Sequence, residues 1–123
     1  MNDQVSPADL SKAAGDLLQY ADPYTAGLWP RAAALLARQS LEQALHDFWA
    51  RTAPGTEVCS MRAQLSCLGR YTRGETAEQA SFLYGVLSEA CHHHPYDLAP
   101  SATELQTWLS ELDEMLTVLT GPS

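Results

Sequence analysis

The sequence has no isoleucine and only four valines, whereas 18 leucines and 18 alanines stand among its 123 residues. Isoleucine and valine are enriched in β-strands, while leucine and alanine are strong helix formers. This composition excludes a β-sandwich, a β-barrel or a parallel sheet. Hydrophobic residues make up 46% of the chain and charged residues 18%, which also excludes a wholly disordered protein. We therefore predict an all-α fold.

Lysine and arginine are absent after residue 73. Residues 74–123 hold eight acidic residues and no base, so this half carries the whole formal net charge of −8. Residues 1–73 hold seven acids and seven bases and are neutral. Tight binding of nucleic acid needs several Lys or Arg contacts to phosphates, which the second half does not supply. We expect a protein partner or a homodimer rather than a nucleic-acid partner.

Long apolar runs are also missing. No run reaches the 18 residues of a membrane span, and the first ten residues are too polar for a secretory signal. The three cysteines are an odd number with no disulfide-framework spacing, and we expect Cys59 and Cys67 to lie in the core. These features indicate a cytoplasmic protein with reduced thiols and no membrane contact. The six-to-one ratio of Arg to Lys is typical of a GC-rich bacterial genome.

The spacing of the apolar residues predicts five helices, at about 7–22, 30–52, 57–69, 76–94 and 102–119. Capping boxes are predicted at Ser6, Thr76 and Ser101, because each precedes an acid or amide three residues later. The apolar face of the second helix is wide, which is typical of a central helix packed on more than one side. Short links favour antiparallel neighbours. We predict one domain over residues 1–123, a compact antiparallel bundle of about five helices.

The predicted core follows from the same spacing. Trp108 flanks the leucine stripe of the last helix, so its side chain could lie either in the core or in a dimer interface. The side chains that we expect to be buried are Leu41, Leu45, Phe48, Leu83, Leu87, Leu109 and Leu112.

A cluster of cysteine and histidine near the end of the fourth helix is the main candidate functional site. Its residues are Cys91, His92, His93, His94, Tyr96 and Asp97. As a metal site it would use Cys91, His94 and Asp97, because the first two share a helical face and the third follows in the loop. The alternative is structural. Histidines in a last helical turn bond free carbonyls and favour the negative end of the helix dipole. We expect the structural role, with no metal and no cofactor.

Motifs for other chemistry are missing. The chain has no GxSxG motif and no glycine-rich phosphate loop. Glu89 and His92 form one ExxH pair, whereas a di-iron bundle needs two. We therefore assign no catalytic residue from the sequence.

A polar strip along the second helix is the secondary candidate site. It consists of Arg38, Gln39, Glu42, Gln43 and His46. Oppositely charged residues four apart, Arg38 with Glu42 and Asp47 with Arg51, are positioned to form ion pairs. A solvated helix face would show the same pattern, and we regard that as the simpler interpretation.

Two segments resemble parts of the HEPN-type bundles. The second-helix segment RAAALLARQSLEQALH, residues 31–46, is similar to the Ala- and Leu-rich second helix of that family. The segment ACHHHPYDLAPS, residues 90–101, falls where the family places its polar functional motif. The resemblance covers residues 28–119. It implies a small domain of four to five helices of the kind found in bacterial conflict and defence systems and in stress RNA processing.

The catalytic motif of that family is absent from this sequence. Active HEPN ribonucleases carry an arginine four to six residues before a histidine, and the pair meets its mate across a dimer. Here the nearest arginine before His92 is Arg73, and Arg38 precedes His46 by eight residues. The resemblance therefore implies a non-catalytic member, an interaction or dimerisation module of a bacterial defence or toxin–antitoxin-type system.

Two alternatives remain open from the sequence. One is a HEPN-type ribonuclease that uses His92, His93 or His94 with an arginine brought close by folding or by a second chain. The other is a metal-binding protein that uses the Cys91–His94 cluster. Both depend on the same cluster of side chains.

Overall fold

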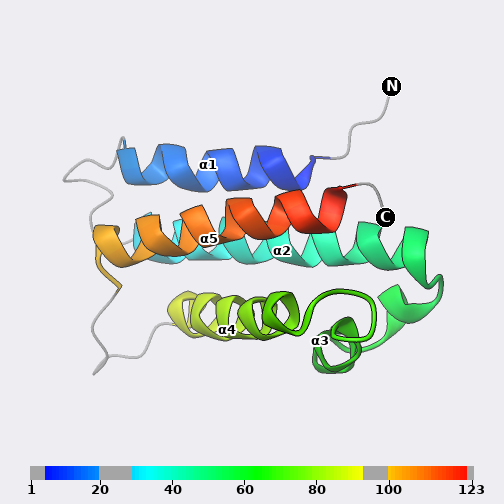
Figure 1. Cartoon of the computed structure of the whole chain (residues 1–123). Coiled ribbons are helices and arrows are strands. Elements are labelled where there is room, and N and C mark those ends of the chain that lie inside the picture. Colours follow the sequence, from blue (N-terminus) through cyan, green and yellow to red (C-terminus); the bar gives the residue numbers. More distant parts are fainter. Residues whose placement is uncertain (1–4, 20–28, 93–99, 122–123) are drawn as a thin grey trace.

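The structure, a computed structural model, describes residues 5–19, 29–92 and 100–121, and all regular secondary structure in this part of the chain is helical. No strand forms among these residues, which confirms the predicted all-α class. Five α-helices and one 3₁₀ turn follow one another in the order shown in Figure 1. They are α1 (Pro7–Gln19), α2 (Trp29–Thr52), η1 (Thr56–Val58), α3 (Met61–Leu68), α4 (Gly74–Cys91) and α5 (Ala102–Thr120).

The long helix α2 is the centre of the bundle. It packs against α1, α4, α5 and η1, as the wide apolar face predicts. Helices α1 and α4 lie on opposite sides of the pair formed by α2 and α5, and α3 packs at the beginning of α4 (Figure 1). Helices α4 and α5 run antiparallel to each other (Figure 1). None of the described helices has the length and apolar character needed to cross a bilayer.

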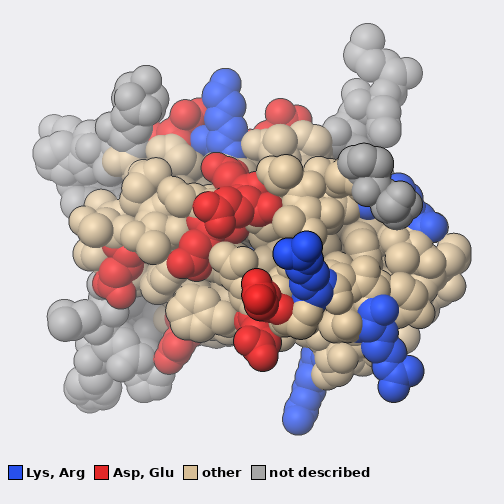
Figure 2. Space-filling model, in the orientation of Figure 1, with Lys and Arg blue, Asp and Glu red and all other residues tan. Residues whose placement is uncertain are grey.

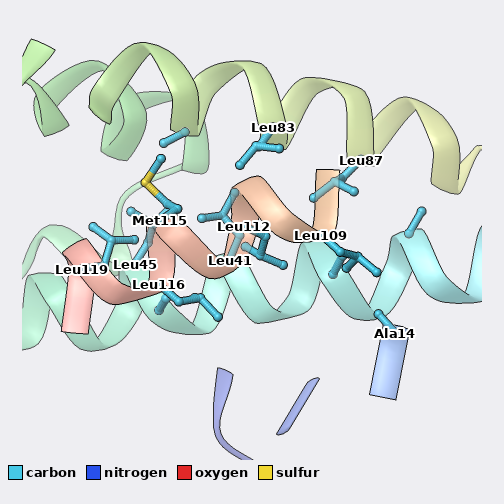
Figure 3. Packing of buried hydrophobic residues seen from close by; sticks show 14 of the residues in the cluster. Ala14, Leu41, Leu45, Leu83, Leu87, Leu109, Leu112, Met115, Leu116 and Leu119 are labelled. Carbon is cyan, nitrogen blue, oxygen red and sulfur yellow. The ribbon is translucent and has the colours of Figure 1, made fainter. Parts of the chain in front are cut away.

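The core lies between α2, α4 and α5. All seven side chains that were expected to be buried are buried, so the predicted helix faces are confirmed. Leu83 and Leu87 of α4 point toward Leu112 and Leu109 of α5 (Figure 3). Alanines line the α2 surface, which lets neighbouring helices approach closely, and Ala14 joins the core from α1.

Two of the three predicted capping boxes form. At the start of α1, the Ser6 hydroxyl oxygen accepts from the Asp9 amide at 3.1 Å, and a carboxylate oxygen of Asp9 accepts from the Ser6 amide at 3.3 Å. At the start of α5, the same reciprocal bonds join Ser101 and Glu104, both at 3.1 Å. Each box satisfies two amides that have no partner within the helix. Helix α1 is described as far as Gln19, so its predicted end at residue 22 lies outside the described residues.

The prediction of one helix over 57–69 is wrong, because the segment divides into η1 and α3. Gly55 adopts φ 103°, in the left-handed region that glycine tolerates, and turns the chain out of α2 into η1. Cys59 is extended, and Ser60 then caps α3 by accepting from the Ala63 amide. The buried Gln64 amide donates to the backbone carbonyls of Glu57 and Cys59. These side-chain bonds make the break between the two turns stable.

The predicted bounds 76–94 for the fourth helix are also wrong at both ends. Helix α4 begins at Gly74, so Thr76 lies inside its first turn and forms no capping box. The N-cap is Arg73, whose backbone is extended and whose side chain makes no capping bond. Glu75 in the first turn is favourable at the positive end of the helix dipole. At the other end His92 is extended (φ −91°, ψ 119°), so the helix ends at Cys91.

Candidate functional site

The cysteine and histidine cluster is only partly within the described residues. Cys91 is the last residue of α4 and is half-buried, and His92 follows it as an exposed C-cap. The other predicted members, His93, His94, Tyr96 and Asp97, lie outside the described residues, and with them two of the three alternative metal ligands. Within residues 5–19, 29–92 and 100–121, no three His, Cys, Asp or Glu side chains gather as metal ligands.

Arg31 joins this end of α4 to the first turns of α2. Its Nε donates to the backbone carbonyl of Cys91 at 2.9 Å, across 60 residues of sequence. A cation at a helix C-terminus satisfies a carbonyl that has no partner in the helix and interacts well with the dipole. This is the role that the histidines were predicted to take. Arg31 was not predicted to belong to the site, because nothing in the local sequence pattern signals a contact across 60 residues.

The Cys91 thiol lies among charges of both signs. Burial raises its pKa above the usual value of 9.0, Arg38 and Arg31 oppose that rise, and Glu42 adds to it. The net direction is upward, so the side chain is a protonated thiol at neutral pH. A protonated thiol is a poor nucleophile, because nucleophilic attack uses the thiolate. The other two cysteines, Cys59 and Cys67, are exposed, so the expectation that they lie in the core is wrong.

The packing of α4 divides the predicted polar strip of α2. Arg38 and Glu42 turn toward α4: their Nε and Oε1 atoms are 4.0 Å apart, and the Tyr84 hydroxyl donates to the other Glu42 oxygen at 3.4 Å. The expected pairing of Arg38 with Glu42 is therefore present at the limit of ion-pair distance. Tyr84 was not predicted to belong to either candidate site. It precedes Cys91 by seven residues, two helical turns, and this spacing was a usable signal that both side chains share one face of α4.

The other residues of the strip, together with Glu42, border a shallow hollow near the start of α1. Its lining residues are Val5, Leu10, Gln39, Glu42, Gln43 and His46. Within it, the Gln43 amide donates to Asp47 at 2.9 Å, and His46 Nδ1 lies 3.5 Å from the same carboxylate group. Arg51, the expected partner of Asp47, donates instead to the backbone carbonyl of Leu119 in α5. These contacts are those of a hydrated helix face.

Large apolar side chains stand exposed on α4 and α5. Phe82 is 55% exposed and Val118 is 52% exposed, although each lies on a helix whose inner face is fully packed. Val86 of α4 and Trp108 of α5 are half-buried at the edge of the core. Of these four side chains, only Trp108 was predicted as a candidate interface residue. The i, i+4 spacing of Phe82 and Val86 outside the inner stripe was the signal that would have found the others.

Helix geometry places these four side chains on one surface. Residues on a helix turn by about 100° each, so Phe82 and Val86 lie on the flank of α4 opposite Tyr84, which faces α2. On α5, Asp113 faces α1, because Ser11 donates to it at 2.7 Å. Trp108 and Val118 lie on the opposite flank. Since α1 and α4 lie on opposite sides of α5 (Figure 1), that flank faces α4. We call the surface made by Phe82, Val86, Trp108, Glu111 and Val118 the α4–α5 flank.

The surroundings of the α4–α5 flank are acidic. Glu75, Glu78 and Glu89 are exposed on α4, and Glu114 is exposed on α5 beside Glu111. Neither helix contains a lysine or an arginine. Figure 2 shows acidic side chains over α5 in the middle of the visible face, with one basic side chain beside them, whereas most other Lys and Arg side chains lie toward the end where α3 packs.

Comparison with known proteins adds no relative. No known protein family matches the sequence, and neither a curated protein nor a solved structure is significantly similar to the chain.

Proposed function

We propose that this protein is a non-catalytic helical interaction module, and that the α4–α5 flank is its binding surface. The observation behind the proposal is the exposure of Phe82 and Val118 on adjoining helices. Single exposed apolar residues are ordinary, but apolar side chains gathered on one surface and rimmed by charges mark interaction sites. The resemblance to HEPN-type bundles leads us to propose a bacterial defence or toxin–antitoxin-type system as the setting.

The side chains of the cysteine and histidine cluster that the structure describes support a non-catalytic role. Nucleophilic catalysis needs an activated thiolate or hydroxyl beside a base. Burial instead raises the pKa of Cys91, and the carbonyl of this residue is already bonded to Arg31. His92 is an exposed helix cap. These contacts hold the end of α4 against α2.

Photo-crosslinking from the α4–α5 flank tests the proposal directly. Benzoylphenylalanine is placed at Phe82 in one variant and at Val58 in a matched control, and each is expressed in the native host and irradiated. Val58 is 85% exposed and lies on η1, so it is more accessible than Phe82 but away from the flank. We expect a discrete crosslinked protein from position 82 alone. If position 82 gives no adduct, or the same adducts as position 58, the proposed binding surface is wrong.

A HEPN-type ribonuclease is the second candidate function, because an arginine contacts the last residue of α4, next in sequence to His92. Arg31 bonds the carbonyl of Cys91, the residue just before His92. The pair would be made of residues far apart in sequence rather than of one motif. The test is incubation of the purified protein with RNA, beside the variants His92→Ala and Arg31→Gln. Cleavage that both variants abolish would favour the ribonuclease, and intact RNA would favour the interaction module.

A further inference from the structure

We propose that the α4–α5 flank binds a basic amphipathic helix of another protein. This inference rests on the proposed function and specifies the chemistry of its partner. Three features of the flank carry it: its apolar content, the charge around it and its shape.

The apolar part of the flank is a strip between two helices. Leu83 of α4 lies beside Leu112 of α5 in the core (Figure 3). Phe82 precedes Leu83 and is turned about 100° away from that contact, where its side chain is 55% exposed. Val86 continues the strip one turn along α4. On α5, Val118 and Trp108 lie ten residues apart on the side that faces α4. Two parallel or antiparallel helices with apolar side chains along their junction form the kind of surface into which a third helix lays its apolar face.

The charge around the strip selects the partner. Acidic side chains are the only charged groups that α4 and α5 themselves carry, and every Lys and Arg of the chain lies before residue 74. One basic side chain from outside these two helices lies beside the acidic ones on the visible face (Figure 2). A helix with lysine or arginine beside its apolar face would place those cations over Glu78, Glu89 and Glu111. Complementary charges speed association and exclude partners of the wrong sign.

A second copy of the chain fits this surface poorly. In a two-fold dimer the same patch of each copy meets that of the other. Every contact therefore occurs twice, with the roles of the two copies reversed. The flank of one copy would then bring Glu111 and its acidic neighbours against the same acids of the other, with no base on α4 or α5 to pair them. Like charges placed together across an interface cost affinity. The occupant that the flank fits is therefore a different, basic segment.

The length of the flank sets the size of the occupant. Helix α4 has 18 residues, which corresponds to about 27 Å at about 1.5 Å per residue. A helix of similar length would cover the whole strip. The probe we choose is a synthetic helix of about that length, with leucine along one face and lysine on the rest, beside an otherwise identical peptide in which glutamate replaces lysine.

The experiment measures binding of each labelled peptide to the purified full chain by fluorescence anisotropy. We expect the lysine peptide to bind, with an affinity that falls as salt is raised, and the glutamate peptide not to bind. Phe82→Ser and Val118→Ser should each weaken binding of the lysine peptide about tenfold, because a helix laid in a groove is held by a few apolar contacts along its length. The matched control Val58→Ser should leave the dissociation constant unchanged. Glu111→Gln should weaken binding more than Asp16→Asn on α1.

Several results would overturn the inference. Equal binding of both peptides would show that charge does not select the partner. Binding of the lysine peptide that Phe82→Ser and Val58→Ser affect equally would show general attraction to an acidic protein. Self-association of the chain that Phe82→Ser abolishes would make a second copy the occupant. A crosslink from position 82 to a partner segment without basic residues would refute this inference and leave the proposed function standing, whereas a missing crosslink refutes the proposed function itself.

Discussion

Truncation of Leu41 to alanine tests the central position of α2. Leu41 is 0% exposed and belongs to the core that α2 shares with α4 and α5 (Figure 3). The change removes three carbon atoms, and at about 0.8 kcal/mol each the lost transfer free energy is about 2.4 kcal/mol. Because α2 is packed against α1, α4 and α5, the space cannot close completely, and the remaining cavity raises the cost to about 3–4 kcal/mol.

Leu35→Ala is the matched control for this prediction. It makes the same change on the same helix, but Leu35 is 39% exposed, so less apolar surface is lost and no closed cavity forms. We expect a cost of about 1 kcal/mol, partly offset because alanine is the better helix former.

Urea unfolding followed by far-UV circular dichroism measures both changes. With a slope of about 2 kcal/mol per M, Leu41→Ala should lower the midpoint by about 1.5–2 M and Leu35→Ala by about 0.5 M. The slope itself should not change, since the same surface is exposed on unfolding. Equal losses for the two variants, or a loss below about 1 kcal/mol for Leu41→Ala, would refute the assignment of the inner face of α2.

Four further predictions concern local contacts and the Cys91 thiol. Ser101→Ala removes the capping box of α5 and should lower the free energy of unfolding by about 1 kcal/mol, whereas the exposed mid-helix change Ser110→Ala should have almost no effect in the same urea assay. Gln64→Ala leaves two carbonyls beside η1 without their amide donor, and calorimetry should show a loss of about 1–3 kcal/mol. Because its pKa is raised, Cys91 should be alkylated by iodoacetamide more slowly than the exposed Cys67, as peptide mass spectrometry would show. The raised pKa of Cys91 also makes the fold more stable at low pH than at high pH. This contribution is fully present below the pKa of the thiol in the unfolded chain. It should be lost as pH rises through 9.0 toward the folded pKa, because the unfolded chain ionises its thiol first.

The sequence predicted most of the helices correctly, but it predicted some of their first and last residues wrongly. The capping boxes at Ser6 and Ser101 were predicted and form, because both partners lie within four residues of each other. The break at Cys59 was not predicted, since it depends on how the side chain of Gln64 folds back on the preceding turn. The box expected at Thr76 does not form, because α4 begins two residues earlier.

The candidate sites were predictable only as residue types. The strip of α2 has the polar character that was expected, but its division between Tyr84 on one side and a hollow beside α1 on the other follows from the packing of α4 and α1. Helical periodicity predicts which side chains of a helix face the core. It does not predict which of the exposed side chains lie beside a neighbouring helix. Phe82 and Val118 become one surface only when α4 and α5 lie side by side.

By itself, then, the sequence determined the helical class, the inner faces of the helices and the acidic second half, because composition, periodicity and charge are properties of the chain that do not depend on its neighbours in space. Tertiary structure alone decided that Arg31 bonds the carbonyl of Cys91, that Glu42 meets Tyr84, and that Phe82 and Val118 are exposed on neighbouring helices. The physical reason is that each of these contacts joins residues from different helices, whose relative rotation and register are set by how their side chains pack.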